Sequence, residues 1–252
     1  MNKKVKLIGS VLLGLILLAG IGACGKKGTK VLRIGTHADY PPFESNQGAA
    51  FVGVDIDLAR KIAEKLDMEY KIVDMDFDTL FPSLNSNKID LAISAITINE
   101  ERKAQVEFSA PYYLANQVII AKPDNKLILN KIDDIGKFVV GAQKGTTGET
   151  FLTENYVDKK LMPTDNLKIY PTSSEAIADM LSGKIDFVII DDSAAQGYSQ
   201  QKPIVVVQKI ETNENYGIAL PKGGELNAKI NQALQELLDS GEVISLIQTH
   251  IQ

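Results

Sequence analysis

Two periods of hydrophobic and polar residues run along the chain, and together they predict alternating strands and helices. The run Val31–Thr36 is rich in branched apolar residues and predicts a buried strand. Residues 55–66 repeat apolar side chains every three or four positions, which predicts a helix with one buried face. By the same criteria we expect helices at 78–87, 172–181 and 226–238, and strands at 70–73, 88–93, 118–121, 138–142, 184–190, 205–207 and 217–220. Alternating strands and helices predict an α/β fold with mainly parallel sheets.

One pattern occurs twice along the chain, which indicates two units of similar build. Residues 84–93 read LNSNKIDLAI and residues 180–189 read MLSGKIDFVI, each a helix end, a tight turn and a buried strand. Five residues after the aspartate of each pattern stand Ala95 and Asp191, just past the carboxyl end of the strand. Ligands bind at that edge of open α/β sheets, so two such edges facing each other would form a cleft. The alternative is chance similarity of a common helix-to-strand turn.

The first 24 residues have the organisation of a secretory signal. Lysines lie within residues 2–6, an apolar run extends from Leu7 to Ala23, and Cys24 follows. The run is short for a transmembrane helix, which needs about 20 apolar residues. Residues 21–24 (IGAC) resemble the bacterial lipobox, in which the cysteine becomes the lipidated N-terminus. We therefore expect a lipoprotein signal peptide over 1–23, a lipid anchor at Cys24 and a tether over 24–30, with an ordinary cleaved signal or an uncleaved anchor as alternatives.

Composition narrows the chemistry that such a fold carries out. The chain has 27 basic and 32 acidic residues and a net charge of −5, and loss of the three lysines in residues 1–23 takes the charge to −8. This balance argues against nucleic acid as a partner, because phosphate binding requires clustered basic residues. One cysteine and two histidines weigh against a metal site of the Cys/His type. We expect no metal and no cofactor, and the hydrolase motifs GxSxG and HExxH do not occur.

Three residues past the strand ends have the chemistry to hold a zwitterion. Thr97 and Arg102 follow the strand at 88–93, and an arginine fork is a natural bidentate partner for a carboxylate. Asp191 follows the strand at 184–190 and is a natural partner for an ammonium group. The competing interpretations are a solvated arginine paired with a neighbouring glutamate, and an aspartate that caps a turn. Spacing alone favours the solvated arginine and leaves Asp191 open.

Several motifs in a fixed order resemble those of bacterial solute-binding proteins of the polar amino-acid type, which serve ABC importers. The most specific is GVDIDLARKIA at 53–63, and supporting stretches are YPPFE at 40–44, TINEER at 97–102, FSAPYY at 108–113 and GTT at 145–147. The resemblance covers residues 31–245 and implies a two-lobe clamp of the periplasmic-binding-protein type, each lobe a mainly parallel sheet flanked by helices. Lobe 1 would comprise 31–121 and 217–252, and lobe 2 would comprise 122–216, with two hinge strands near 121–122 and 216–217.

The resemblance also implies roles for residues of the cleft. Arg102 would bind the α-carboxylate of the ligand, assisted by Thr97 and by the backbone of Thr147. Asp191 would bind the α-ammonium, with the Ala95 carbonyl and the Thr97 hydroxyl as further partners. The remaining expected contacts are Tyr40, whose ring would lie against the ligand side chain, and Thr146, Gln143, His37 and Phe77.

Two positions depart from the family pattern and bear on the ligand side chain. Many relatives carry aspartate where His37 stands, and in binders of basic amino acids that acid contacts the ligand. Many also carry phenylalanine where Val54 stands, so Phe77 would supply the aromatic wall unless it is a core residue. Asp39 is the nearest alternative acid, and His37 is either a hydrogen-bonding residue of the pocket or a residue of its rim. Gln143 suits a neutral and a cationic side chain equally well.

The implied function is capture of a free polar L-amino acid by closure of the lobes and its delivery to an ABC importer permease. A basic amino acid such as arginine, lysine or histidine is favoured, with glutamine next. We expect a monomer outside the cytoplasm, lipid-anchored to a bacterial membrane, with no cofactor and no nucleic-acid partner. Two alternatives remain: an enzyme of the same fold, such as a cyclohexadienyl dehydratase acting on prephenate or arogenate, and a sensory lipoprotein that binds amino acids without a transporter.

Overall fold

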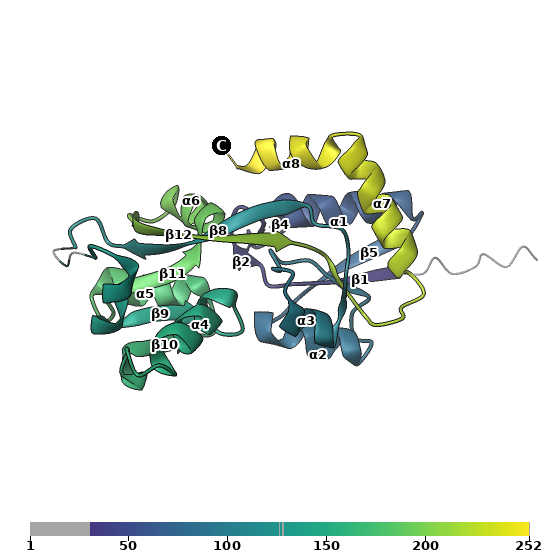
Figure 1. Ribbon diagram of the computed structural model, residues 1–252. Coiled ribbons are helices and arrows are strands. Elements are labelled where there is room, and N and C mark those ends of the chain that lie inside the picture. Colours follow the sequence, from purple (N-terminus) through teal and green to yellow (C-terminus); the bar gives the residue numbers. More distant parts are fainter. Residues whose placement is uncertain (1–30, 126, 128, 252) are drawn as a thin grey trace, which may run out of the picture.

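The fold is α/β, as the sequence pattern predicts, and its elements form two lobes joined by two long strands (Figure 1). The computed structural model describes residues 31–125, 127 and 129–251, so the predicted signal peptide, Cys24 and the tether lie outside the described residues. Three short strands, β2 (Asp39–Tyr40), β3 (Glu44–Asn46) and β4 (Phe51–Val52), form a small separate sheet in the first lobe.

The first lobe is built on a sheet with the strand order β5-β1-β6-β13-β7. Strand β1 pairs in parallel with β5 and β6, whereas β13 pairs in antiparallel with β6 and β7. Helices α1, α7 and α8 pack together on one side of this sheet, and α2 and α3 lie on the other (Figure 1). The bounds are β1 (Val31–Thr36), α1 (Val54–Lys65), β5 (Glu69–Asp74), α2 (Leu80–Asn85), β6 (Leu91–Ala92), α3 (Glu100–Gln105), β7 (Glu107–Phe108), β13 (Ala219–Leu220), α7 (Asn227–Asp239) and α8 (Glu242–His250).

The second lobe is built on a sheet with the strand order β10-β9-β11-β8-β12. Strand β9 pairs in parallel with β10 and β11, and β8 pairs in antiparallel with β11 and β12. Both sheets are therefore mixed rather than mainly parallel, because the strands next to the two crossings between the lobes run antiparallel to their neighbours. The bounds are β8 (Tyr113–Ala121), β9 (Val140–Gln143), α4 (Thr147–Leu152), β10 (Leu167–Tyr170), α5 (Ser173–Ser182), β11 (Phe187–Asp191), α6 (Asp192–Ser199) and β12 (Val205–Tyr216).

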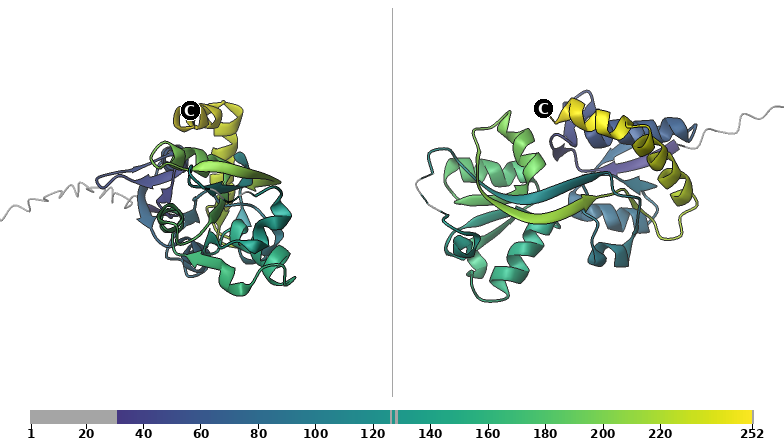
Figure 2. Two further views of the ribbon diagram at one scale, coloured as in Figure 1. Left: turned by 90° about the vertical axis from the view of Figure 1, so that its left-hand side faces the viewer. Right: turned by 45° about the horizontal axis from the view of Figure 1, so that its top comes forward.

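Strands β8 and β12 connect the lobes as an antiparallel pair. Their register runs from Ala121 opposite Val205 to Tyr113 opposite Tyr216, and Figure 2 shows them as a curved ribbon between the two halves. Strand β8 belongs to the second sheet, although the sequence places residues up to 121 in lobe 1, so we propose a lobe boundary just before β8. The apolar segment 118–121 marks only the end of this strand, because polar residues such as Asn116 precede it.

Helix α1 begins where the chain approaches itself closely. Gly53 precedes it with φ of 135°, and a β-carbon there would lie 2.1 Å from the carbonyl oxygen of Phe43. Only glycine fits such a position without displacing the neighbouring backbone. Ala59 and Ile62, on the predicted apolar face of the helix, are fully buried. This packing also fixes Asp55, in the first helical turn, inside the lobe.

The pattern that occurs twice in the sequence has the same structure at both places. Asn87 and Gly183 occupy equivalent positions of the two turns, and both adopt left-handed backbone conformations, with φ of 55° and 81°. Asp90 and Asp186 each accept a hydrogen bond from a backbone N–H of the adjacent segment, at 2.8 and 2.9 Å. The two segments are therefore similar in structure as well as in sequence, and the strand that follows the turn ends at an equivalent position in each lobe.

Several elements differ from the sequence prediction. Helices α6 and α8 and strand β10 were not predicted, and β6 covers only Leu91–Ala92 instead of 88–93. Helix α6 lacks a repeat of large apolar residues because its buried positions are small, among them Ala194, Ala195 and Gly197. Pro82 lies in the first turn of α2, where proline is tolerated, so the helix begins later than the predicted residue 78.

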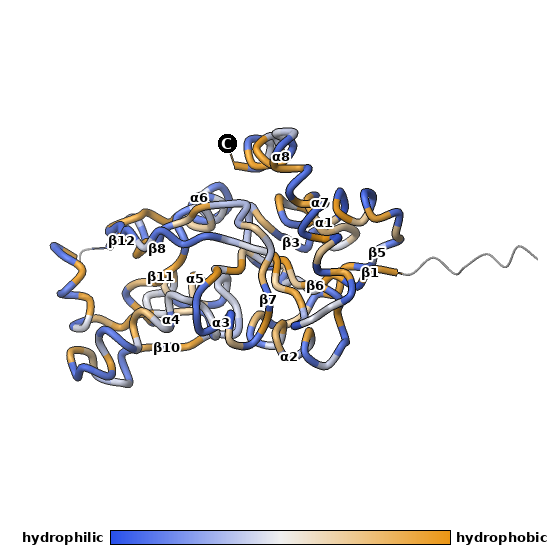
Figure 3. The backbone as a smooth tube through the Cα atoms, turned by 45° about the vertical axis from the view of Figure 1, so that its right-hand side comes forward, coloured by the Kyte–Doolittle hydropathy of each residue, from blue (hydrophilic) through white to orange (hydrophobic). Residues whose placement is uncertain are grey.

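Hydrophobic residues gather inside each lobe, where the strands run (Figure 3). Phe187, on β11, packs in the core of the second lobe with Val140. Leu80 and Leu84, on α2, pack beneath the first sheet. These cores fix the strands whose ends carry the predicted site residues.

Candidate functional site

Twelve residues line a cavity between the lobes, and all ten ligand contacts expected from the sequence are among them. Asp191 ends β11 and Thr147 begins α4, so cavity residues stand at strand ends and helix beginnings. The structure adds Glu44 and Ser94, which the sequence analysis did not select. The lining comprises His37, Tyr40, Glu44, Phe77, Ser94, Ala95, Thr97 and Arg102 from the first lobe, and Gln143, Thr146, Thr147 and Asp191 from the second.

Arg102 is held at the cavity wall by neutral partners. Its Nη1 donates to the Thr97 carbonyl oxygen at 2.8 Å, and its Nη2 donates across the lobes to the Gly145 carbonyl oxygen at 3.0 Å. The guanidinium carbon lies 5.6 Å from the centre of the Phe77 ring and 5.9 Å from that of Phe81. The side chain is only 6% exposed, so the interpretation as a solvated surface arginine is wrong. Burial lowers the pKa of Arg102, and nearby carboxylates oppose that shift.

Asp191 is surrounded by hydroxyl and amide donors. Its Oδ2 accepts from the Tyr40 hydroxyl at 2.8 Å and from the Tyr216 hydroxyl at 2.5 Å, and its Oδ1 accepts from Gln117 Nε2. Burial raises the pKa of Asp191 from its ordinary 3.8 to about 7, and the negative charge of Glu214 adds to the shift. Asp191 precedes α6, but its side chain does not cap that helix. Its donors therefore hold it as a residue of the cavity rather than of a turn.

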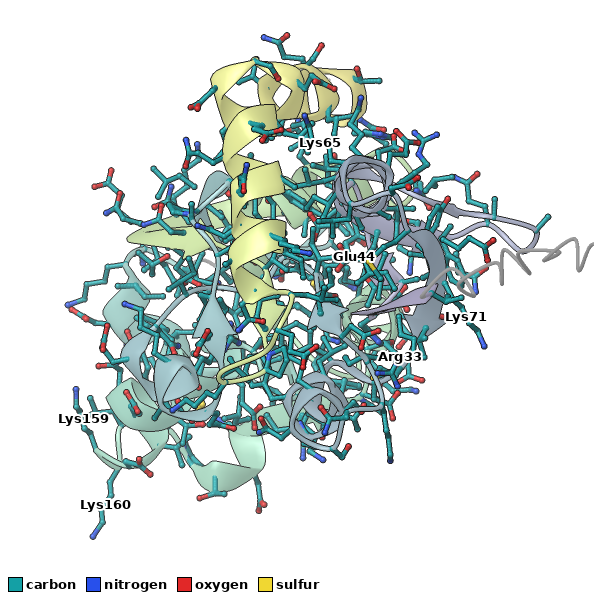
Figure 4. The ribbon with its side chains drawn as sticks, turned by 90° about the vertical axis from the view of Figure 1, so that its right-hand side faces the viewer. Arg33, Glu44, Lys65, Lys71, Lys159 and Lys160 are labelled. Carbon is teal, nitrogen blue, oxygen red and sulfur yellow. The ribbon has the colours of Figure 1, made fainter. Side chains whose placement is uncertain are left out.

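A pair of carboxyl groups, Glu44 and Asp55, supports the first-lobe wall of the cavity. Asp55 Oδ2 accepts from the Ala95 N–H at 2.7 Å and from the Tyr112 hydroxyl at 2.9 Å, and Glu44 Oε1 accepts from Ser94 Oγ at 2.7 Å. Figure 4 shows Glu44 inside the molecule, whereas the lysines labelled at the lower left and the right extend outward. Burial and the adjacent Asp55 raise the pKa of Glu44 well above its usual range. Glu44 therefore keeps its proton and donates a hydrogen bond to Asp55. This bond accounts for Glu44 Oε2 and Asp55 Oδ1, which have no other hydrogen-bond partner among the described residues.

The cavity wall around His37 and Gln143 carries polar groups of two kinds. His37 Nδ1 lies 3.0 Å from the Met75 carbonyl oxygen, which can only accept, so Nδ1 carries the hydrogen. His37 Nε2 is buried and has no hydrogen-bond partner among the described residues. Both ends of the Gln143 amide are occupied, since Oε1 accepts from Ser173 Oγ at 2.8 Å and Nε2 donates to the Pro171 carbonyl oxygen at 3.2 Å. His37 therefore offers the ligand an unused acceptor, whereas Gln143 keeps one N–H and one lone pair beyond these two bonds.

Phe77 and Thr146 shape the wall rather than presenting free polar groups. Phe77 stacks beside Arg102, as described above, while it also packs against the core under α2. Thr146 caps α4, because its Oγ1 accepts from the Glu149 N–H at 3.3 Å and donates to the Gln143 carbonyl oxygen at 2.7 Å. This cap fixes the first turn of α4, where Thr147 stands.

Contacts along the rim hold the two lobes together. The hydroxyl of Tyr198 donates to the Asp39 carbonyl oxygen at 2.5 Å, and Asp39 Oδ2 accepts from the Ser174 N–H at 3.1 Å. Lys144 forms an ion pair with Asp78 across the lobes at 2.8 Å. Asp39, considered above as an alternative acid for the ligand, thus binds the opposite lobe and does not line the cavity.

The lobes approach each other closely where α6 meets the first lobe. A β-carbon at Gly197 would lie 2.5 Å from the carbonyl oxygen of Pro41, so no larger residue fits without moving the backbone. Val54, the second departure from the family pattern, is fully buried in the core and does not line the cavity. The aromatic residues beside the cavity are Tyr40 and Phe77.

Glu214, on β12, is a residue of this region that the sequence analysis missed. It is 8% exposed and accepts hydrogen bonds from the hydroxyls of Thr97, at 2.7 Å, and Thr147, at 2.6 Å. A signal was present in the sequence, since Glu214 stands two positions before the buried Tyr216 and shares its strand face. Because residues 211–215 (ETNEN) are all polar, the sequence shows no alternation of apolar and polar residues that would mark Glu214 as buried.

Residues 31–125, 127 and 129–251 contain neither a candidate metal site nor a candidate membrane-spanning helix. In these residues no group of three or more histidine, cysteine, aspartate or glutamate side chains is placed to hold a metal ion. Among the helices of the described chain, none has the length and apolar character needed to cross a membrane.

Comparison with known proteins gives consistent results across sequence and structure. The model of the bacterial extracellular solute-binding proteins, family 3, matches residues 32–252. The arginine-binding extracellular protein ArtP of Bacillus subtilis is 35% identical over 236 residues, which cover 89% of each chain. A solved ancestral arginine-binding protein bound to arginine is 37% identical, with a TM-score of 0.81 over 88% of this chain and 98% of that one. An ancestral arginine-binding protein bound to glutamine is 38% identical, with a TM-score of 0.80 over 87% and 97%.

Proposed function

The chain belongs to the bacterial extracellular solute-binding proteins of family 3, and from this premise we propose that it binds a free polar L-amino acid and delivers it to an ABC-type importer. The observation that carries the proposal is the pair of opposite charges, Arg102 and Asp191, which line one cavity from different lobes. They match the two charged ends of an amino acid, so a ligand that joins them stabilises the closed arrangement.

Each end of the ligand has its own set of partners. Arg102 binds the α-carboxylate through two parallel N–H···O hydrogen bonds, and the backbone N–H groups of Thr97 and Thr147 bind it as well. Asp191 accepts from the α-ammonium, with the Ala95 carbonyl as a further acceptor. Tyr40 is held by its hydrogen bond to Asp191, so its ring forms a fixed wall beside the ligand side chain.

A side chain that ends in N–H donors suits the remaining space, because His37 Nε2 is an unused acceptor there. The Glu44 carboxyl, which holds its proton, makes the wall more polar without adding a negative charge. ArtP is named for arginine, and the two ancestral structures hold arginine and glutamine, whose side chains share terminal N–H donors. We therefore place arginine, lysine, histidine and ornithine first, and glutamine next.

Family membership places this function outside the cytoplasm. We propose further that Cys24 is lipidated, that residues 24–30 tether the protein to a membrane, and that it works as a monomer which docks on a permease. The support for the anchor is the apolar run at 7–23 followed by the chain's single cysteine. Replacing Cys24 with alanine should release the protein from the membrane fraction without changing its ligand affinity.

A thermal-shift screen against all L-amino acids tests the proposal. A ligand at 100 times its dissociation constant adds about 2.7 kcal/mol to the free energy of unfolding, and each kcal/mol raises the melting temperature of a protein of this size by about 2–4 °C. We expect the largest shifts with the basic amino acids and a smaller one with glutamine, while D-arginine and L-glutamate serve as controls. An absence of any shift with all L-amino acids would refute the proposal.

A further inference from the structure

Glu214 is buried at the junction of the two lobes, on the inward face of strand β12. The pairing of β12 with β8 shifts between Ile210 and Glu214, and Asn213 adopts a left-handed conformation with φ of 51°. Asn213 and Asn215, the neighbours of Glu214 in the chain, are exposed, whereas Glu214 is only 8% exposed. The even-numbered residues from 208 to 216 face inward on both sides of this shift, so Glu214 directs a carboxylate inward from a hinge strand.

Three donors converge on this carboxylate. Oε2 accepts from the Thr97 hydroxyl of the first lobe at 2.7 Å and from the Thr147 hydroxyl of the second at 2.6 Å. Oε1 accepts from Gln117 Nε2 at 3.1 Å. Thr97 and Thr147 line the cavity, whereas Glu214 stands behind them and does not. One carboxylate thus binds a cavity residue of each lobe at the same time.

These contacts decide which part of each hydroxyl is available to a ligand. A hydroxyl has one proton and two lone pairs. Glu214 takes the proton of both Thr97 and Thr147, so towards any other group these hydroxyls act as acceptors. The Gln117 amide has two protons, and its shorter contacts with Asp191 and with Glu214 use both, so the 3.2 Å contact between Gln117 Nε2 and Thr147 Oγ1 leaves the lone pairs of Thr147 available.

We propose that Glu214 is a positioning residue that makes the Thr97 and Thr147 hydroxyls acceptors for the ligand's α-ammonium. The proposal deepens the function proposed above and rests on it. It assigns the α-carboxylate to Arg102 and to backbone N–H groups alone, because neither hydroxyl has a proton left to donate. On this proposal both hydroxyls act as acceptors for the ammonium only when the lobes are closed, because only then does Glu214 accept from Thr97 and Thr147 at the same time.

The test compares Glu214→Gln with Glu211→Gln, an exposed glutamate three residues earlier on the same strand. A glutamine amide at 214 cannot accept at both ends, so it must turn an N–H donor towards either the threonines or Gln117. Calorimetric titrations use L-arginine and desamino-arginine, in which hydrogen replaces the α-ammonium group. We expect Glu214→Gln to weaken L-arginine binding about tenfold or more, in keeping with the loss of a hydrogen bond to a charged group. Desamino-arginine binding should change by less than about threefold, and Glu211→Gln should leave both affinities unchanged.

Equal loss for both ligands would overturn the proposal, since it would mean that Glu214 only holds the lobes together; no loss for either would overturn it as well. Failure of the wild-type chain to bind L-arginine would instead count against the proposed ligand, so the two failures are distinguishable. If Glu214→Gln does not fold, Glu214→Asp keeps the charge and withdraws it by one methylene. That variant should show the same selective loss of L-arginine affinity.

Discussion

Arg102 and Asp191, the two charged residues of the cavity, differ in whether their charge depends on pH. Arg102 keeps its positive charge at physiological pH, because a guanidinium is not deprotonated in proteins even where burial lowers its pKa. Asp191 has a pKa of about 7, because burial and the charge of Glu214 oppose its ionisation. The site therefore combines a permanent cation in the first lobe with a conditional anion in the second.

This difference gives the lobes separate tasks. The first lobe binds the ligand carboxylate whatever the pH, since its cation is always present. The second lobe gains a full negative charge when an ammonium group arrives to stabilise it. A ligand without an ammonium leaves Asp191 partly protonated, so closure of the second lobe onto it yields less electrostatic stabilisation.

Removal of the permanent cation should have the largest effect. Arg102→Ala leaves the ligand carboxylate buried without its partner, which costs about 3–5 kcal/mol of binding free energy, so binding should vanish in calorimetry. Arg102→Lys, the matched control, keeps the charge but loses the fork and should bind with intermediate affinity. Tight binding by a folded Arg102→Ala variant, checked by its melting curve, would be incompatible with the carboxylate assignment.

Titration of the conditional anion should have a moderate effect. Below pH about 7 the ligand-free protein carries a proton on Asp191 that the ligand's ammonium must displace, so L-arginine affinity should fall by up to about tenfold per pH unit and level off above pH 7. The same raised pKa also affects folding stability. Between pH 3.8 and about 7 the Asp191 carboxyl is ionised in the unfolded chain but protonated in the folded one, so its contribution to the free energy of unfolding declines as the pH rises through this range. Titrations at four values between pH 5 and pH 8 measure the slope.

Asp191→Asn is the control for this slope, because it removes the titrating group and keeps its shape. The variant should bind more weakly above pH 7 and should lose the pH dependence. In the wild type, burial and the charges of Glu214 and Asp192 raise the pKa of Asp191, and the hydroxyls of Tyr216 and Tyr40 lower it. If the slope persists in Asp191→Asn, Asp191 is not the group whose titration controls binding.

Replacement of a carboxyl that already holds its proton should have the smallest effect. Glu44→Gln exchanges a neutral acid for a neutral amide that still donates to Asp55, so the free energy of unfolding should change by less than about 1 kcal/mol in a denaturant titration. Asp55→Ala removes the acceptor of the Ala95 N–H and of the Tyr112 hydroxyl, and should cost more, about 1–3 kcal/mol for each donor left unpaired. A larger loss in Glu44→Gln than in Asp55→Ala would show that Glu44 is the ionised partner.

Features with a local cause could be predicted from the sequence. Strand β1 has the predicted bounds, and α5 begins after Thr172, the first residue of the predicted helix, whose Oγ1 accepts from the Glu175 N–H at 3.1 Å. It ends at Gly183, which adopts the left-handed conformation that favours glycine. The position of Arg102 past a strand end was visible too, but the choice between a cavity arginine and a surface arginine needed the family motifs.

Features with a tertiary cause could not be predicted from the sequence. Asp55 reads as an ordinary acid of a first helical turn, and its complete burial follows from the packing of α1 against the sheet. Glu214 lies in a polar run with Glu211 and Asn213, and its position on the same strand face as Tyr216 does not show that Thr97 and Thr147 meet it there. Strand β8 continues through polar residues because β12 and β11 pair with it on both sides.

The approach of Gly197 to Pro41 has a consequence for the dissociation constant. An alanine at 197 would place its β-carbon 2.5 Å from the Pro41 carbonyl oxygen, closer than such atoms approach, so it would hold the lobes apart without touching the cavity. The apparent dissociation constant equals the intrinsic one divided by the fraction of molecules that can close. A hydrogen atom in place of a methyl group, outside the cavity, therefore helps to set the solute concentration at which this protein is half saturated.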